Sequence, residues 1–531
     1  MTAYDAVVIG AGPNGLVAAN RLADAGWSVL VLEAQPEVGG AVRSDRELDP
    51  DFVTDTFSAF YPFSAASPVL KALDLEQHGV RWLHAPAVLG HPRADGTWAL
   101  LHRDREVTAA SLDAIHPGDG KAWLDLAQWW DGIGDDLVRA LLSPFPPVRA
   151  GLRTGPGLLR AGGLEAVRTL LAPVADIAKE RFGGEGGPLL LAGNAAHSDI
   201  PLNSPGSGLL GIMLAMLGQT VGFPVPEGGA GRLSAALSRR LTSRGGVVQC
   251  DTEVTRVEVS GGRVTGVTTA DGERVAVRRA VLADVSAPAL FDRLLRPDDV
   301  PGRVRRSMER FRMDPGTVKV DWALSGPVPW ASPPDHAPGT VHVAPSMEAL
   351  TRATQQLEVG VVPADPFLLT GLMTSSDPSR SPAGTESMWA YTHVPQPDGF
   401  IADAGGTITG RWDHDDLERM GDRMQEQIER HAPGFGSIVR ARRVLGPLEL
   451  EARDANLIGG ALGGGTSQLQ QQLVFRPVPA LRGRPETGIA GLYLASAAIH
   501  PGGGVHGACG NNAAQAALRH AALSGLFSRS R

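Results

Sequence analysis

Near its start the chain places a glycine-rich turn between a strand-like apolar run, residues 6–9, and a stretch whose apolar residues recur at helical spacing. Gly10 and Gly12 permit a tight turn and close approach of the backbone to a ligand, and Gly15 lets the helix pack on the strand. A second apolar run ends at Glu33, 21 positions beyond Gly12, where a carboxylate can bind ribose hydroxyls and repel a 2′-phosphate. This order predicts a dinucleotide site with the pyrophosphate at the helix N-terminus. Its expected binding residues are Gly10, Gly12, Pro13, Asn14, Gly15, Glu33 and Ala34.

A second flexible turn follows at Gly39 and Gly40, close behind the acidic strand end. Arg43 comes shortly after it, and its guanidinium fork suits phosphate oxygens. An arginine on a surface loop is the simpler alternative, but the two glycines before it favour a role in binding. We therefore expect Gly39, Gly40 and Arg43 to complete the phosphate side of the site.

The most distinctive stretch lies near the other end of the chain. There a strand-like run, residues 492–495, leads into a glycine loop, residues 502–504, and then into a helical pattern. Glycines in this loop let the backbone approach a flat ring without a side-chain clash, and a helix N-terminus stabilises negative charge near it. An ordinary C-terminal helix that docks on the protein is the alternative. We expect Gly503, Gly504 and Val505 to contact the cofactor.

The order of glycine turn, acidic strand end and Gly-Gly-x-x-Arg resembles the amine oxidase and phytoene desaturase superfamily of FAD enzymes. The run from His500 through Gly502, Gly503 and Gly504 to Val505 closely resembles the C-terminal signature of the bacterial phytoene desaturase family. The segment 476–479, Arg-Pro-Val-Pro, resembles the subgroup that contains animal pyridine nucleotide-disulfide oxidoreductase domain-containing protein 2. His506 departs from the family pattern, in which a small or apolar residue is usual at this position.

This resemblance implies a Rossmann-type α/β domain that binds FAD and a mixed α+β substrate domain. It also implies oxidation of a C–C or C–N bond in a lipophilic, polyene- or terpenoid-like molecule by hydride transfer to flavin N5. The flavin supplies the redox chemistry, while the protein supplies orientation and a dry pocket. Negative charge gathers at N1 and O2 of the reduced flavin, which suits the helix N-terminus behind the C-terminal glycine loop. The family pattern further places the backbone around Val254 beside the adenine and Ala283 and Asp284 near the ribose.

Residues 218–290, between the two glycine motifs, combine an amphipathic helical pattern with several alternating strands. The resemblance assigns this segment to the nucleotide domain. The sequence alone indicates a helix followed by a small meander of strands. We therefore expect a discontinuous FAD-binding domain made of residues 1–60, 218–290 and 482–531. The substrate domain is expected to comprise residues 61–217 and 291–481.

Composition narrows the class of protein. The 531 residues, 43% of them hydrophobic, fit a globular protein of two or three domains. A net charge of −8 gives no electrostatic reason to expect nucleic acid as a partner. Two cysteines cannot build a disulfide framework, and a first strand that begins by Tyr4 leaves no room for a signal peptide, so a cytoplasmic protein is expected. The histidines lack metal-ligand spacing, so no metal is expected.

The nearest approach to a membrane span is residues 200–226, which contain no charged residue. Prolines leave a helix of residues 208–217, which is too short to cross a bilayer. A buried helix is the leading interpretation, and the wall of a lipophilic channel or a patch on a membrane face are the alternatives. Arginines nearby would suit an anionic membrane surface, although a solvated face explains them more simply; they are Arg149, Arg153, Arg160 and Arg168. Peripheral membrane contact and oligomeric state both stay open.

Four side chains are candidates for the chemistry. His506 and His500 could accept or relay a proton because imidazole titrates near neutral pH, with a structural histidine bonded to its own loop as the alternative. His197 precedes the uncharged stretch and could face the substrate, or else be a capped loop histidine. Strand alternation places Lys319 and Asp321 on one face. In amine oxidases a strand lysine holds a water near flavin N5, but a solvated outer face explains both residues more simply.

The leading hypothesis is therefore flavin-dependent desaturation of a hydrophobic small molecule. An amine oxidase that uses O₂ is the second hypothesis, and a flavin-binding interaction protein without turnover is the third. The electron acceptor, whether O₂, a quinone or another molecule, stays open.

Overall fold

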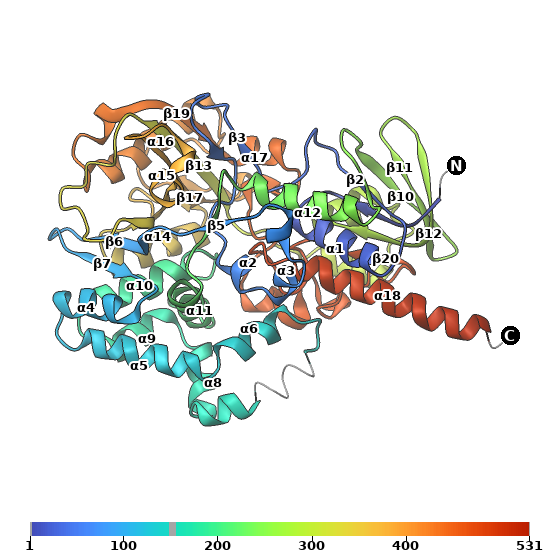
Figure 1. Ribbon diagram of the computed structural model, residues 1–531, viewed down its shortest axis with the longest axis horizontal. Helices are drawn as coiled ribbons and strands as arrows, with labels where there is room; N and C mark the ends of the chain where they lie inside the picture. The colour runs from blue at the N-terminus through green and yellow to red at the C-terminus, as the bar shows by residue number, and fades with distance from the viewer. Residues whose placement is uncertain (1–2, 148–154, 530–531) are drawn as a thin grey trace.

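Two large sheets, placed side by side, organise the protein (Figure 1). The computed structural model describes residues 3–147 and 155–529. The first sheet is centred on β1 (Ala3–Ile9), which pairs in parallel with β2 (Val29–Leu32) and β12 (Arg274–Ala283). β9 (Val247–Gln249) adds to β2, and β20 (Leu492–Leu494) adds to β12, both in parallel. The ends of the chain and its middle thus share one sheet.

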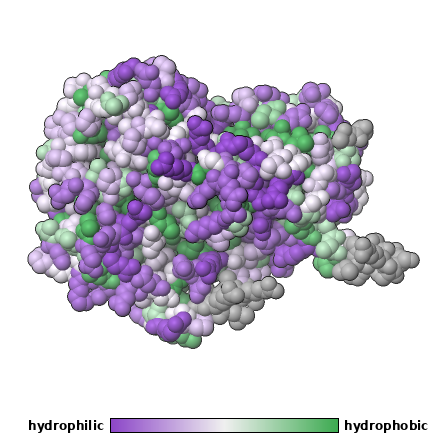
Figure 2. All heavy atoms as spheres, in the orientation of Figure 1, coloured by the Kyte–Doolittle hydropathy of each residue, from purple (hydrophilic) through white to green (hydrophobic). Residues whose placement is uncertain are grey.

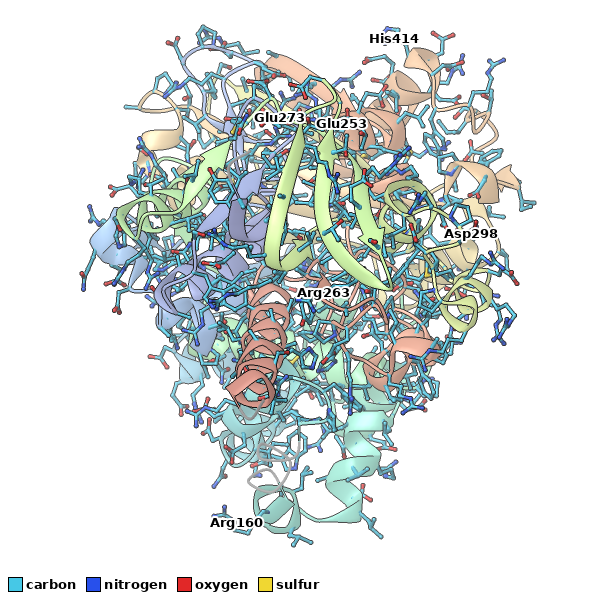
Figure 3. All side chains as sticks on the ribbon, turned by 90° about the vertical axis from the view of Figure 1, so that its right-hand side faces the viewer. Arg160, Glu253, Arg263, Glu273, Asp298 and His414 are labelled. Carbon is cyan, nitrogen blue, oxygen red and sulfur yellow. The ribbon has the colours of Figure 1, made fainter. Side chains whose placement is uncertain are left out.

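An antiparallel meander extends this sheet beyond β12. It consists of β10 (Val254–Ser260), β11 (Arg263–Thr269) and β12. Figure 3 shows Glu253 and Glu273 at one end of the meander and Arg263 near the opposite end, as expected for strands joined by tight turns. The helix expected before it is α12 (Gly231–Ser243). The run at 247–250, expected from the sequence to be the first of the alternating strands after this helix, does not join the meander, because β9 pairs with β2 instead.

The two faces of the first sheet bury alternate residues of β1. Val8 packs with α12, α1 (Pro13–Asp24) and α18 (Ala508–Arg529), whereas Val7 packs with apolar residues of the meander and of α13 (Gly302–Met308). Because both faces are covered, the sheet is a buried Rossmann-type layer, and the predicted α/β fold is confirmed.

The second sheet is mostly antiparallel and lies on the other side of the molecule. Its order is β19-β13-β17-β16-β14-β6-β7. The bounds are Val439–Leu445, Gly316–Leu324, Glu386–Val394, Leu368–Leu372, Pro338–Val343, Ala87–Pro92 and Trp98–Leu101 in that order. Trp322 of β13 packs with α16 (His414–Glu429) on one face. The other face is the inward one, toward helices and the N-terminal segment.

A group of helices covers the β6–β7 end of the second sheet (Figure 1). They are α4 (Arg105–Ile115), α5 (Asp119–Asp131), α6 (Gly134–Leu142), α8 (Leu164–Leu171), α9 (Val174–Arg181), α10 (Gly186–Ala195) and α11 (Ser207–Thr220). α11 lies within the uncharged stretch 200–226, and nearly all of this helix is buried in the core of the group. The buried-helix interpretation is therefore confirmed. No helix within the described ranges has the length and apolar composition needed to cross a membrane.

Of the two arginines of the basic region that the structure describes, Arg168 is paired with acidic residues and Arg160 donates to a backbone carbonyl. Arg149 and Arg153 lie outside the described residues. Arg160 is exposed at the end of the molecule away from the meander, as Figure 3 shows. Arg168 pairs with two carboxylates, Glu165 at 2.8 Å and Glu180 at 2.9 Å. Figure 2 shows a surface on which polar residues predominate and apolar residues form small groups.

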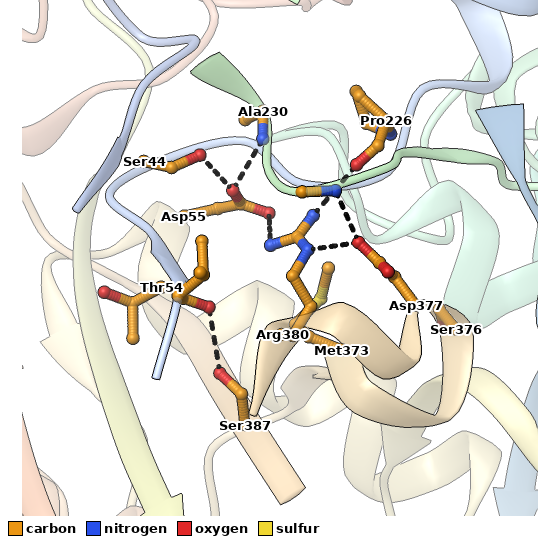
Figure 4. A network of polar contacts seen from close by, with 12 residues as sticks. Ser44, Thr54, Asp55, Pro226, Ala230, Met373, Ser376, Asp377, Arg380 and Ser387 are labelled. Atoms are coloured by element: carbon orange, nitrogen blue, oxygen red, sulfur yellow. Dashed lines mark hydrogen bonds and ion pairs between the residues drawn. The ribbon is translucent and has the colours of Figure 1, made fainter. Parts of the chain in front are cut away.

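A fully buried ion network joins the two halves of the molecule (Figure 4). Arg380 donates to Asp55 and to Asp377, each at 2.9 Å, and the three side chains are at most 1% exposed. Asp55 lies on β4 (Thr54–Asp55) and accepts the Ala230 N–H at 2.8 Å, just before α12. The arginine therefore connects the N-terminal segment, the start of α12 and the second sheet.

We predict that Arg380→Met lowers the free energy of unfolding by about 3–5 kcal/mol, because it leaves two buried carboxylates without a cation. Chemical unfolding of the purified protein measures this loss. Arg352→Met removes an exposed arginine from its pair with Glu348 and should change stability by less than about 1 kcal/mol. Equal effects of the two substitutions would contradict the role given to the network.

Three histidines form a hydrogen-bonded row between the second sheet and α10. His91 Nε2 lies 3.1 Å from His342 Nδ1, and His342 Nε2 lies 2.8 Å from His197 Nε2. Gly193 of α10 passes directly over this row, and a Cβ there would lie 2.6 Å from His91 Nε2. Burial lowers the pKa of His91 and of His197 to about 3, and lowers the pKa of His342 well below its usual 6.5. The row is therefore neutral in the folded protein at neutral pH.

The row predicts acid destabilisation. Between about pH 6.5 and about pH 3 the unfolded chain protonates these imidazoles while the folded protein does not, so stability falls as the pH falls through this window. His91→Leu should make the decrease in thermal midpoint between pH 7 and pH 5 smaller than in the parent protein. His414→Gln, which removes an exposed imidazole, serves as the control and should leave the decrease unchanged. A His91→Leu profile that parallels the parent would refute the assignment.

Candidate functional site

The glycine turn between β1 and α1 is shaped so that side chains cannot enter it. Gly10 has φ +91°, and a Cβ on Gly15 would overlap the Gly10 carbonyl oxygen. A Cβ on Gly12 would lie 2.8 Å from Oδ2 of Asp284. α1 begins at Pro13, so the positive end of its dipole faces this turn, where the Gly15 N–H is donated to Asp284. The turn is thus a cradle of backbone that suits a pyrophosphate.

Glu33 closes one side of the cradle at the end of β2. Its carboxylate accepts the Ala11 N–H at 2.6 Å and the Gln35 N–H at 2.9 Å, and it is 8% exposed. The Glu33 carbonyl accepts from Thr252, two residues before Val254 at the start of β10. Ala34 is exposed directly after β2. The acidic strand end and the start of the meander therefore lie side by side, as the family pattern implied.

The second glycine turn lies against the first. Gly39 donates its N–H to the Ala11 carbonyl at 2.9 Å, and a Cβ on Gly40 would lie 3.2 Å from the Cα of Gly12. The Arg43 guanidinium donates to the carbonyls of Gly40, at 3.0 Å, and Arg453, at 2.6 Å. Arg43 therefore holds two loops together at the edge of the cradle.

The C-terminal glycine loop lies beside the same cradle. α18 crosses α1 so closely that a Cβ on Gly510 would overlap the carbonyl oxygen of Asn14. A Cβ on Gly504 would lie 3.1 Å from the Phe63 ring, and one on Gly503 would lie 3.4 Å from Gly463. The Val505 carbonyl accepts from Ser64 in α2 (Pro62–Ala66). The two glycine motifs, almost five hundred residues apart, thus meet at the starts of adjacent helices.

Asp284, which the family pattern placed near the ribose together with Ala283, directly follows β12 and contacts the glycine turn. Its carboxylate accepts the Gly15 N–H at 2.7 Å. Burial raises the pKa of Asp284 to about 8, opposed by the Gly15 hydrogen bond. Asp454 is partly buried near the second glycine turn, and desolvation raises its pKa as well. An acidic residue after an apolar strand was the available signal for Asp284, whereas nothing in the sequence marks Asp454.

These residues fit FAD. The backbone cradle leaves room that any Cβ would fill. The Glu33 carboxylate lies at the end of β2, where it can bind ribose hydroxyls. The C-terminal glycine loop, which precedes α18, lies beside the cradle. The start of α18 offers N–H groups to the negative charge of a reduced flavin ring.

His506 and His500 flank the C-terminal loop, and each has a different environment. His506 Nδ1 accepts the Ala508 N–H at 3.0 Å, so the neutral ring carries its hydrogen on Nε2. Burial lowers the pKa of His506 to about 4. Both nitrogens of His500 lack partners in the described residues, and burial, followed by the charge of Arg476, lowers its pKa to about 4.

The other two catalytic candidates lie elsewhere. His197 belongs to the buried histidine row and not to the C-terminal loop. Lys319 and Asp321 do share one face of β13, but they form a buried ion pair and are 3% and 1% exposed. Arg443 donates to the same Asp321 at 2.8 Å. The solvated outer face that was the simpler explanation is therefore wrong, because this face of the sheet points inward.

The cysteine in the loop region is a packing residue. Cys509 is fully buried, and its thiol lies 3.4 Å from the Gly502 carbonyl. Burial raises its pKa to about 12, so the thiol is inert. Among the described residues, no group of histidines, cysteines and acids is arranged to hold a metal ion.

Comparison with known proteins finds matches in two parts of the chain. The family model for an NAD(P)-binding Rossmann-like domain matches residues 8–74, and the model for flavin containing amine oxidoreductases matches residues 159–352. Cyclohexylamine oxidase from Brevibacterium oxydans has a similar fold, with a TM-score of 0.58 at 16% identity over 98% of this chain and 99% of that one.

Two relatives match over nearly their full length. Pyridine nucleotide-disulfide oxidoreductase domain-containing protein 2 of Mus musculus is 29% identical over 97% of this chain and 93% of the mouse protein. A lycopene-forming phytoene desaturase of Pseudescherichia vulneris is 25% identical over 96% of this chain and 98% of that enzyme. The fold, the two family models and these relatives agree that the chain is a phytoene desaturase-like oxidoreductase that uses FAD.

Proposed function

We propose that FAD lies between the cradle after β1 and the loop before α18, and that the enzyme dehydrogenates an apolar small molecule held against the inward face of the second sheet. The proposed cofactor-binding residues are Gly10, Gly12, Pro13, Asn14, Gly15, Glu33, Ala34, Gly39, Gly40, Arg43, Val254, Ala283, Gly503, Gly504 and Val505. Asp284 joins them because it contacts the same turn.

The observation that carries this proposal is a row of aromatic side chains that starts next to the C-terminal loop. Phe60, three residues before the Phe63 that touches Gly504, lies 6.1 Å from the ring of Trp389. Trp389 stacks on Tyr391 at 5.9 Å, and Tyr391 meets His393 at 5.6 Å. These residues of β17 form a row of neighbouring rings whose faces suit an extended hydrophobic substrate.

The row ends at a cavity with a polar side. Its lining includes Phe367, Leu357, Asp199 and His393. Burial raises the pKa of Asp199 to about 6, and both nitrogens of His393 lack partners within the described residues. The cavity therefore offers hydrogen bonds at the far end of the aromatic row, where they would bind a polar end of the substrate.

The histidines near the loop have distinct proposed roles. The bound flavin supplies the two-electron acceptor, and the protein must place the substrate, exclude water and handle one proton. His506 presents an N–H, so we assign it hydrogen-bond donation. His500 has a free lone pair and is neutral at pH 7, so we assign it proton acceptance.

Amine oxidation with O₂ is a second candidate function, favoured by the acids at the cavity. Asp199 and Glu358 both line it, and burial raises the pKa of each. Carboxyl groups there would suit an ammonium group. Lys319 lies directly opposite Tyr391 in the sheet register, on the inward face that such a substrate would contact.

The cofactor placement predicts that Gly504→Val abolishes FAD retention. A valine there would be strained at φ +122° and would collide with Phe63. This is the position where the flavin ring is proposed to lie. The ratio of flavin to protein absorbance in the purified protein measures retention. Gly272→Val is the matched control, since Gly272 also has positive φ but nothing within 4 Å of its Cβ position. Full FAD content in Gly504→Val would disprove the placement.

The substrate proposal predicts that terpenes or other apolar molecules bleach the bound flavin under anaerobic conditions. It also predicts that Trp389→Ala lowers kcat/KM at least tenfold while the FAD content stays unchanged. Trp330→Ala, which alters an aromatic pair on Trp98, should leave kcat/KM unchanged. A panel of amines assayed in parallel separates the two candidate functions. If only amines bleach the flavin, and peroxide forms in air, the enzyme is an amine oxidase and not a desaturase. Equal kcat/KM for Trp389→Ala and the parent would eliminate the aromatic row as the substrate site.

A further inference from the structure

We propose that Arg476 is a positioning residue that raises the reduction potential of the flavin from beneath the C-terminal glycine loop. This inference rests on the proposed placement of FAD. It concerns a residue that sequence analysis noted only as part of a family motif.

Arg476 is a buried cation whose bonds all go to backbone carbonyls. It is 1% exposed, and its guanidinium donates to Gly463 at 2.8 Å, to Thr466 at 3.0 Å and to Ala497 at 2.8 Å, with a further contact to Gly465. Among the described residues it forms no ion pair. Burial of an arginine without a carboxylate partner is costly and therefore unusual in a structural role alone.

The guanidinium holds together the two segments that wall the proposed flavin site. Ala497 follows β20 and leads into the loop, and a Cβ on Gly502 would lie 3.4 Å from the Arg476 Cζ atom. Gly463, bonded to the same guanidinium, lies 3.4 Å from the Cβ position of Gly503. Arg476 thus fixes the underside of the loop from both directions.

The charged and titratable groups around Arg476 do not neutralise its positive charge at close range. Asp314 and Asp199 act on it from a distance, and Asp314 already accepts the N–H groups of Gly463, at 2.6 Å, and Gly465, at 2.9 Å. Cys509 is a neutral thiol, and His500 is a neutral imidazole at pH 7. The positive field therefore extends to the loop and adds to that of the α18 N-terminus.

This field acts differently on the two redox states of the cofactor. Reduction adds negative charge to the flavin ring, so a nearby buried cation binds the reduced form more tightly than the oxidised form. Tighter binding of reduced FAD than of oxidised FAD raises the reduction potential of the bound flavin, because the ratio of these two binding constants sets the size of the potential shift. A higher potential favours removal of hydride from a carbon that carries no activating charge.

The test is a redox titration of the holoenzyme and three variants, with the flavin spectrum as the readout. Arg476→Met should weaken binding of reduced relative to oxidised FAD at least tenfold, which lowers the midpoint potential by about 30 mV or more for a two-electron couple. Arg476→Lys keeps the charge and should retain most of the parent potential. Arg423→Met removes an arginine of α16 that is 10% exposed and pairs with Asp403, and it should leave the potential unchanged.

An Arg476→Met holoenzyme with the parent potential would overturn the proposal, as would an Arg476→Lys potential that falls as far as that of Arg476→Met. If Arg476→Met does not retain FAD, its apoprotein is titrated separately with oxidised and with reduced FAD. The ratio of these two binding constants is the quantity that the potential reports, and a ratio equal to that of the parent protein overturns the proposal. Gly504→Val separately tests where the flavin lies, so failure of the placement and failure of the Arg476 role are distinguishable.

Discussion

The contact between α1 and α18 is the constraint on which the rest of the structure depends. Gly510 lies so close to the Asn14 carbonyl that any side chain there would force the two helices apart. That single approach joins the first and last helices of the chain, and it places the starts of both helices, with their glycine turns, at one point. A dinucleotide can then contact two helix N-termini at once, which neither motif could offer alone.

Buried cations stabilise the junctions that this contact creates. Arg380 joins the N-terminal segment to the second sheet through two carboxylates, and Arg476 joins the loop before α18 to residues 463–466 through carbonyls alone. The difference matters electrostatically. A cation paired with carboxylates contributes little field beyond its site, whereas one solvated by carbonyl dipoles keeps its net charge. The first arrangement suits a structural junction and the second a site that must accept negative charge.

Much of the nucleotide layer was predictable because its signals are local. The strand, turn and helix around Gly10 and Gly12 follow from glycine geometry and apolar spacing, and Glu33 follows at a distance that one βαβ unit fixes. The inward face of β13 was not predictable. Strand alternation gives Lys319 and Asp321 a common face but does not say whether that face meets solvent or protein, because this depends on Arg443 and the N-terminal segment.

The sequence by itself determined a dinucleotide site, the strand that carries its glycine turn, and the uncharged helix that must be buried, since each depends on residues close to one another along the chain. Only the tertiary structure decided which histidines share an environment, that Arg476 has no carboxylate partner among the described residues, and that an aromatic row of β17 leads away from the C-terminal loop. These features join residues tens to hundreds of positions apart. Their distances are set by how the two sheets pack, and no local pattern records that packing.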